Sequence, residues 1–71
     1  MDYVQLALSS NIASVGYDSA QQLLEVVFRS GAKYSYESVP SAVADGLLNA
    51  PSAGRYFNEN IRNVFKFTRA L

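Results

Sequence analysis

The spacing of the apolar residues changes at Val39-Pro40, just past the middle of this 71-residue chain. Before this point apolar and polar residues alternate, most clearly over residues 23–29, which is the period of a β-strand. After it, Val43, Leu47 and Ala50 recur at intervals of four and three residues, which is the period of an amphipathic helix. The change of period predicts an α+β chain in which a sheet is followed by helices.

Short strands are expected before the change of period, at residues 4–8, 12–17, 23–29 and 33–38. The polar connection at residues 18–22 and the turn at Gly31 have the lengths that join antiparallel neighbours. We therefore expect a three- to four-stranded antiparallel sheet. Gly16 indicates a bulge or a close approach of another backbone, and space for a ligand is the alternative.

Two helices are expected after the change of period, both packed on one face of the sheet. Pro40 favours a helix start, and Ser38 is placed to cap it. Gly46 would let this first helix lie close to the sheet. Ser52 is expected to cap the second helix, and Asn63 to end it.

The second helix is expected to close the core. Phe57 and Ile61 lie four residues apart and therefore share one face of this helix. The remaining residues, 64–71, alternate aromatic and basic side chains, which suits either a short edge strand or an extended arm. Residues 1–71 thus form a single domain, without a repeat or a linker.

The composition excludes several kinds of chemistry. The chain contains no cysteine and no histidine, so disulfides, zinc sites and thiol or imidazole catalysis are absent. Its six carboxylates are scattered singly, and no glycine-rich loop with a lysine is present to hold phosphate. We therefore predict a protein that is not an enzyme and has no metal or cofactor. Self-association would bury further apolar surface in so small a domain, which favours a homo-oligomer.

The charge is balanced overall but unevenly distributed. Six basic and six acidic residues give a net charge of zero, which argues against strong general attraction to phosphate backbones. Residues 55–69, however, contain four basic residues and one acidic residue, a net charge of +3. Ordinary solvated surface charge is the simpler interpretation of this bias. Because no run approaches the roughly 20 apolar residues of a membrane span, and Asp2 stands where a secretory leader has a basic flank, a cytoplasmic location is expected.

Many spaced positions follow the pattern of a known family. They are Ser9-Ser10-x-Ile12, Val15-Gly16-Tyr17-Asp18, Leu24-x-Val26-x-Phe28-x-x-Gly31-x-x-Tyr34-x-Tyr36-x-x-Val39-Pro40 and Leu47-x-x-Ala50-x-Ser52-x-Gly54-x-Tyr56-Phe57-Asn58-x-x-Ile61-Arg62. In this order they resemble the KTSC domain, which is named for a segment at the C-terminus of some lysyl-tRNA synthetases and also occurs as small bacterial and viral proteins. The resemblance supplies no catalytic residue. It implies RNA or a protein partner near the translation machinery, or a small viral accessory role.

Aromatic and basic residues provide the candidate ligand-binding site. The set comprises Tyr34, Tyr36, Arg55, Tyr56, Asn58, Arg62 and Lys66, with Arg69 beside it. Aromatic rings stack on bases and guanidinium groups hold phosphate, so this set predicts a non-enzymatic binding module for RNA or a nucleotide-type ligand. Alternatively, the two strand tyrosines cover the core and the asparagine satisfies backbone groups. The alternative function is a protein–protein interaction module, docking by its apolar tail and acting as a viral accessory on a host factor.

Overall fold

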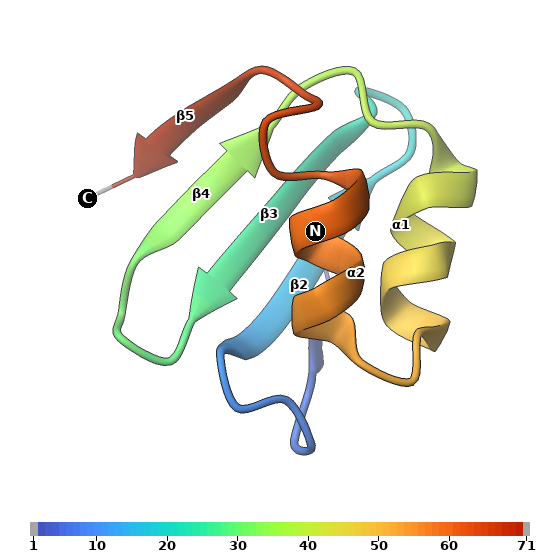
Figure 1. Ribbon diagram of the computed structural model, residues 1–71. Helices are drawn as coiled ribbons and strands as arrows, with labels where there is room; N and C mark the ends of the chain where they lie inside the picture. The colour runs from blue at the N-terminus through green and yellow to red at the C-terminus, as the bar shows by residue number, and fades with distance from the viewer. Residues whose placement is uncertain (1, 71) are drawn as a thin grey trace.

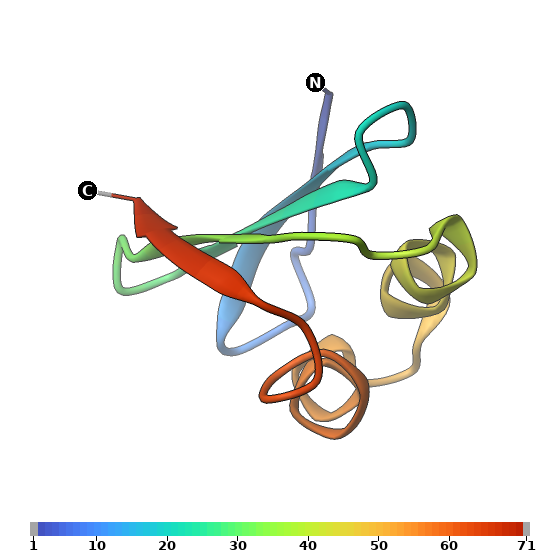
Figure 2. The same ribbon diagram turned by 90° about the horizontal axis from the view of Figure 1, so that it is seen from above.

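Five strands form one antiparallel sheet, and two helices cover one of its faces, in the computed structural model, which describes residues 2–70 (Figures 1 and 2). The strands are β1 (Tyr3–Gln5), β2 (Ile12–Asp18), β3 (Leu23–Phe28), β4 (Lys33–Tyr36) and β5 (Phe67–Ala70). The helices are α1 (Ser41–Asn49) and α2 (Ala53–Asn60). The α+β class and the two helices on one face are confirmed, although the sheet has five strands rather than three or four.

The additional strand comes from the C-terminal tail. β5 pairs with β4, with Phe67 opposite Tyr36 and Arg69 opposite Tyr34. Of the two possibilities for the tail, the edge strand is therefore correct and the extended arm is wrong. Leu71, the last residue of the expected tail, and Met1 lie outside the described residues.

The core lies between the sheet and the two helices. Its buried residues are Ile12, Val15, Leu24, Val26, Tyr36, Val39, Ala44, Leu47, Phe57 and Ile61. The predicted role of α2 is confirmed, because Phe57 is buried and its ring packs edge-on against Tyr36 and Phe28, with centroids 5.5 and 5.4 Å away. Within residues 2–70, no helix has the length and hydropathy needed to cross a membrane.

One predicted helix cap is confirmed and two predicted boundaries are wrong. The Ser52 hydroxyl accepts a hydrogen bond from the Arg55 amide at 3.3 Å, as expected of an N-cap. Ser38 caps nothing: α1 has Pro40 at its N-cap without a side-chain bond, and Ser38 adopts a left-handed φ of 57° in the turn before it. α2 ends at Asn60, and Asn63, with φ of 65°, lies in the turn that follows.

Gly46 brings α1 close to α2, not to the sheet as its sequence position suggested. A Cβ atom on Gly46 would lie 2.6 Å from Cζ of Tyr56, a distance that side chains do not tolerate. The absence of a side chain on α1 is therefore what allows the Tyr56 ring of α2 to lie against it.

Gly16 is not a bulge, because its pairing with Glu25 is regular. It sits in β2 between Tyr3 on β1 and Glu25 on β3, and the Tyr3 hydroxyl donates a hydrogen bond to Glu25. The tyrosine side chain crosses β2 at the glycine to reach this carboxylate. The register irregularity of β2 falls instead between Ile12 and Ser14.

The first strand is shorter than the alternation predicts, because the chain turns away at residues 7–8. Leu6 still donates its amide to the Ala13 carbonyl, and its side chain packs against the core, whereas Leu8 is fully exposed. Leu8 therefore lies outside the strand that was expected over residues 4–8, and it takes no part in the core.

Candidate functional site

A cleft of about 570 Å³ opens on the helix-covered side of the sheet, where β3, β4 and β5 meet the end of α2. We call it the aromatic cleft. The described residues that line it are Ser10, Asn11, Phe28, Arg29, Ser30, Ala32, Tyr34, Tyr36, Phe57, Asn58, Arg62, Asn63 and Phe67. None of these carries a carboxylate, so the charged groups of the lining are its two arginines.

Five rings pack against one another in this cleft, and they differ in accessibility. Phe67 lies 5.4 Å from Tyr34 and 5.6 Å from Tyr36 between ring centroids. Tyr36 and Phe57 are 3% and 4% exposed, and Phe67 is 48% exposed. The cluster therefore has a buried floor and one ring, Phe67, that presents much of its surface to solvent.

Arg62 is the cation of the cleft that is available to a ligand. It follows α2, its residue is exposed, and it forms no ion pair with a carboxylate of residues 2–70. Burial raises the pKa of the Tyr36 hydroxyl and the nearby Tyr34 acts in the same direction, while the positive charge of Arg62 lowers it. The hydroxyl of Tyr36 therefore remains a neutral hydrogen-bonding group beside the permanent positive charge of Arg62.

Arg29 also lines the cleft, but two of its three guanidinium nitrogens, Nε and Nη2, already donate to backbone carbonyls. Its Nε donates to the Ser9 carbonyl at 2.7 Å, and its Nη2 donates to the carbonyls of Leu6 and Ala7 at 2.7 and 3.5 Å. The guanidinium thus holds the loop between β1 and β2. The sequence shows only an arginine at the end of a strand and gives no sign of these distant carbonyls.

Phe67 also lines the cleft, and the sequence did not single it out as a candidate site residue. The alternation of the tail could have indicated this residue. If the tail is a strand paired with β4, Phe67 and Arg69 lie on the same face of the sheet as Tyr36 and Tyr34. Arg69 indeed lies over the Tyr34 ring, with its Cζ 5.7 Å from the centroid.

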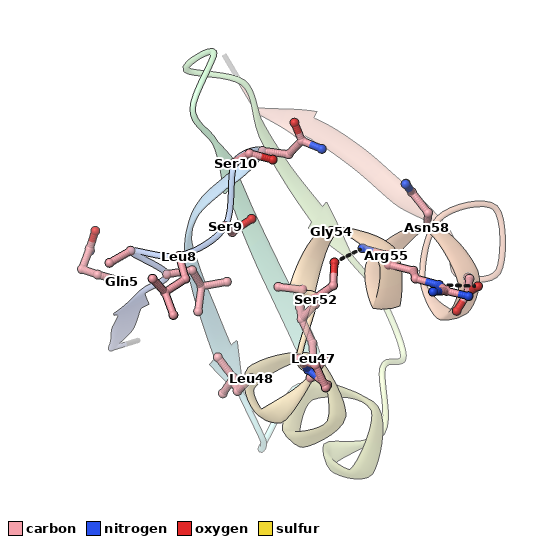
Figure 3. Close-up of a pocket in the computed structure, with 17 residues that line it drawn as sticks. Gln5, Leu8, Ser9, Ser10, Leu47, Leu48, Ser52, Gly54, Arg55 and Asn58 are labelled. Carbon is pink, nitrogen blue, oxygen red and sulfur yellow. Dashed lines mark hydrogen bonds and ion pairs between the residues drawn. The ribbon is translucent and has the colours of Figure 1, made fainter.

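A second cleft, of about 670 Å³, lies between residues 5–11 and the connection of the two helices (Figure 3). We call it the helix-junction cleft. Figure 3 shows Ser9 and Ser10 on one side of it, with Ser52 and Gly54 on the helical side. Arg55 lines this cleft and pairs with Glu59 at 3.3 Å.

The structure therefore divides the predicted binding set. Four members, Tyr34, Tyr36, Asn58 and Arg62, meet in the aromatic cleft, and Asn58 borders the helix-junction cleft as well. The other three do not join them. Arg55 belongs to the second cleft, Tyr56 packs against α1 at Gly46, and Lys66 lines neither cleft, although its carbonyl accepts the Glu37 amide at 2.9 Å.

Known proteins are similar to this chain in sequence and in fold. An uncharacterised protein of Stutzerimonas stutzeri is 57% identical over 58 residues, which cover 82% of this chain and 76% of that protein. A lysine–tRNA ligase of Nostoc punctiforme is 43% identical over 58 residues, which cover 82% of this chain but 10% of the ligase.

The structural comparison extends over nearly the whole chain. The crystal structure of a KTSC domain protein from Yersinia pestis matches with a TM-score of 0.93 at 31% identity, covering 99% of this chain and 97% of that one. Residues 8–65 match the family model of the KTSC domain, and this chain therefore belongs to the KTSC domain family.

Proposed function

We propose that this KTSC domain is a binding module, without catalytic activity, that takes RNA or a nucleotide-type ligand in the aromatic cleft. The observation that carries the proposal is the presence in one cleft of an accessible ring, Phe67, and of a guanidinium, Arg62, that forms no ion pair with any carboxylate of residues 2–70.

The chemistry of the cleft suits such a ligand. Stacking of a base on an aromatic side chain is worth about 1–3 kcal/mol, and a guanidinium binds phosphate through a planar set of donors. None of the described residues in the lining carries a carboxylate that would repel a phosphate. Its volume also lies within the range of about 300–1,000 Å³ that is usual for small-ligand sites.

The relatives support RNA as the class of ligand. A segment similar to this chain occurs in a lysine–tRNA ligase, and the name of that enzyme includes an RNA substrate. The match covers a tenth of the ligase, so its aminoacylation activity is not carried over to this chain.

The balanced net charge indicates that any affinity for RNA depends on particular residues. A protein with zero net charge gains little from general attraction to phosphates, so its affinity must come from the cleft itself. A single charge removed inside the cleft should therefore matter more than the same change elsewhere.

The test compares two arginines on the same segment of the chain. Binding of fluorescein-labelled single-stranded RNA and of tRNA is measured by fluorescence anisotropy at low salt for Arg62→Gln and Arg55→Gln. We expect Arg62→Gln to weaken binding by about tenfold or more, since a charge-assisted contact is worth about 1.5–3 kcal/mol. Arg55→Gln, which removes the same charge from the other cleft, should change it less than about twofold. Equal losses, or no binding at all, would contradict the proposal.

The alternative function, a protein–protein interaction module, has a separate readout. Because the tail forms β5 and pairs with β4, deleting residues 65–71 would remove a strand of the sheet and is not a clean test. The test is capture of a partner protein from nuclease-treated lysate. The alternative is favoured if the wild type captures a protein, Phe67→Ala does not, and the wild type does not bind RNA. The expected homo-oligomer stays a prediction, which light scattering checks.

A further inference from the structure

We infer that the aromatic cleft holds one unpaired nucleotide of a single strand, with its base on Phe67 and its flanking phosphates at Arg62 and Arg69. This inference rests on the proposed function and names the form of RNA that the cleft accepts.

Phe67 is the ring that a base can reach. Tyr36 is buried, and Arg69 lies over the ring of Tyr34, which also receives the edge of Phe28. Phe67 stands on β5, the last strand of the sheet, so no further strand of residues 2–70 lies beyond it. One exposed ring offers a stacking surface for one base.

Each of the two cations lies near a different member of the tyrosine pair that Phe67 contacts. Arg69 is directly opposite Tyr34 in the register and sits over its ring, while Arg62 lines the cleft near Tyr36. Phe67, opposite Tyr36, contacts both tyrosine rings. A base on Phe67 would therefore have a cation on each side of it.

This spacing of charges matches a nucleotide inside a strand. Such a nucleotide carries a phosphate on both the 5′ and the 3′ side of its sugar, whereas a free monophosphate carries one. A duplex does not suit the cleft, because each paired base is covered on both faces by its neighbours and RNA is read by stacking where bases are splayed out.

The experiment uses fluorescein-labelled hexauridylate, a strand that stacks little on itself, as the probe. A hairpin duplex and uridine monophosphate serve as competitors. Three variants are compared with the wild type: Phe67→Leu, Phe67→Trp and Val4→Ala. Val4 is the matched control, since it is 48% exposed like Phe67 but lies on β1 at the opposite edge of the sheet. Thermal melts of each variant show that the fold is kept.

We expect Phe67→Leu to weaken binding by about fivefold or more, because it keeps an apolar side chain but loses the stacking face. Phe67→Trp should bind at least as well as the wild type, and Val4→Ala should be unchanged. With two phosphate contacts, the slope of log K against log salt should be about −1.4, and it should fall to about −0.7 in either Arg62→Gln or Arg69→Gln.

Several results would overturn the inference. If Phe67→Leu binds hexauridylate as tightly as the wild type, no base stacks on Phe67 and the inference is wrong. The proposed function would still stand if Arg62→Gln weakened binding. If uridine monophosphate competes as strongly as unlabelled hexauridylate, the cleft binds free nucleotides. This result would contradict the contact with two phosphates. Competition by the duplex would exclude the unpaired base. Failure of hexauridylate and tRNA to bind at all would instead overturn the proposed function itself.

Discussion

Phe67 on β5 lies directly opposite Tyr36 on β4, and the centroids of the two rings are 5.6 Å apart. This pair joins the last strand of the chain to the core, since Tyr36 is buried and packs against Phe57 of α2. It also builds the aromatic cleft, because Phe67 keeps about half of its surface exposed. The strand that completes the sheet is therefore the strand that completes the candidate site.

Ser52 should contribute to stability as a helix cap, and Ser38 should not. Ser52→Ala removes the acceptor of the Arg55 amide and is expected to lower the free energy of unfolding by about 1 kcal/mol. Ser38→Ala, the matched control, removes no cap and should change it by less than about 0.5 kcal/mol. Urea denaturation measures both, and equal losses would contradict the assignment.

Gly46 should not tolerate a side chain while Tyr56 is present. Gly46→Ala improves helix propensity by about 1 kcal/mol but drives a methyl group into the Tyr56 ring, at a cost of about 1–3 kcal/mol. We expect a net loss of stability, measured by urea denaturation. In the background of Tyr56→Leu the same substitution should be neutral or stabilising. Identical effects in the two backgrounds would show that the helices do not meet at this point.

Arg29 should act on stability and not on ligand affinity. Lysine keeps the charge but loses the planar donor set that binds the carbonyls of Ser9 and Leu6. Arg29→Lys is therefore expected to lower the free energy of unfolding by about 1 kcal/mol and to leave hexauridylate binding unchanged. Arg55→Lys, at an exposed ion pair, is the control, with an expected change below about 0.5 kcal/mol. A loss of binding in Arg29→Lys would place Arg29 among the ligand contacts.

Tyr36 should make the protein less stable in strong alkali. Burial, with the nearby Tyr34, raises its pKa in the folded protein above the ordinary value of about 10. The unfolded chain therefore loses this proton first. The neutral Tyr36 contributes its full stabilisation to the folded protein below about pH 10, and this stabilisation is lost as the pH rises towards the folded pKa. Urea denaturation as a function of pH should show a smaller alkaline loss in Tyr36→Phe. Parallel curves for the two proteins would contradict the raised pKa.

Structural features that depend on residues within one segment could be predicted from the sequence. The alternation of residues 23–29 yielded β3, the four-residue spacing of Phe57 and Ile61 yielded the buried face of α2, and Ser52 was recognised as a cap. Each of these features depends on residues that are close in the chain, so local spacing was sufficient to predict them.

Structural features that depend on contacts between residues far apart in the chain could not be predicted from local spacing. Tyr56 looked like a surface residue beside other polar groups, yet its environment is set by Gly46 on the other helix. Arg29 binds carbonyls some 20 residues away. The tail shows a strand-like alternation, but its partner β4 precedes it by two helices, so nothing local decides between a strand and a free arm.

Binding of RNA in the aromatic cleft can be located by an NMR titration of the isotope-labelled protein with hexauridylate, because backbone amide shifts change most near the bound ligand. We predict that the largest changes fall on the residues that line the aromatic cleft on β3, β4, β5, the turn between β3 and β4 and the turn after α2, which are 28–30, 32, 34, 36, 62, 63 and 67. Changes centred on residues 5–9 and 47–55, the helix-junction cleft, or spread evenly over the surface, would contradict the account.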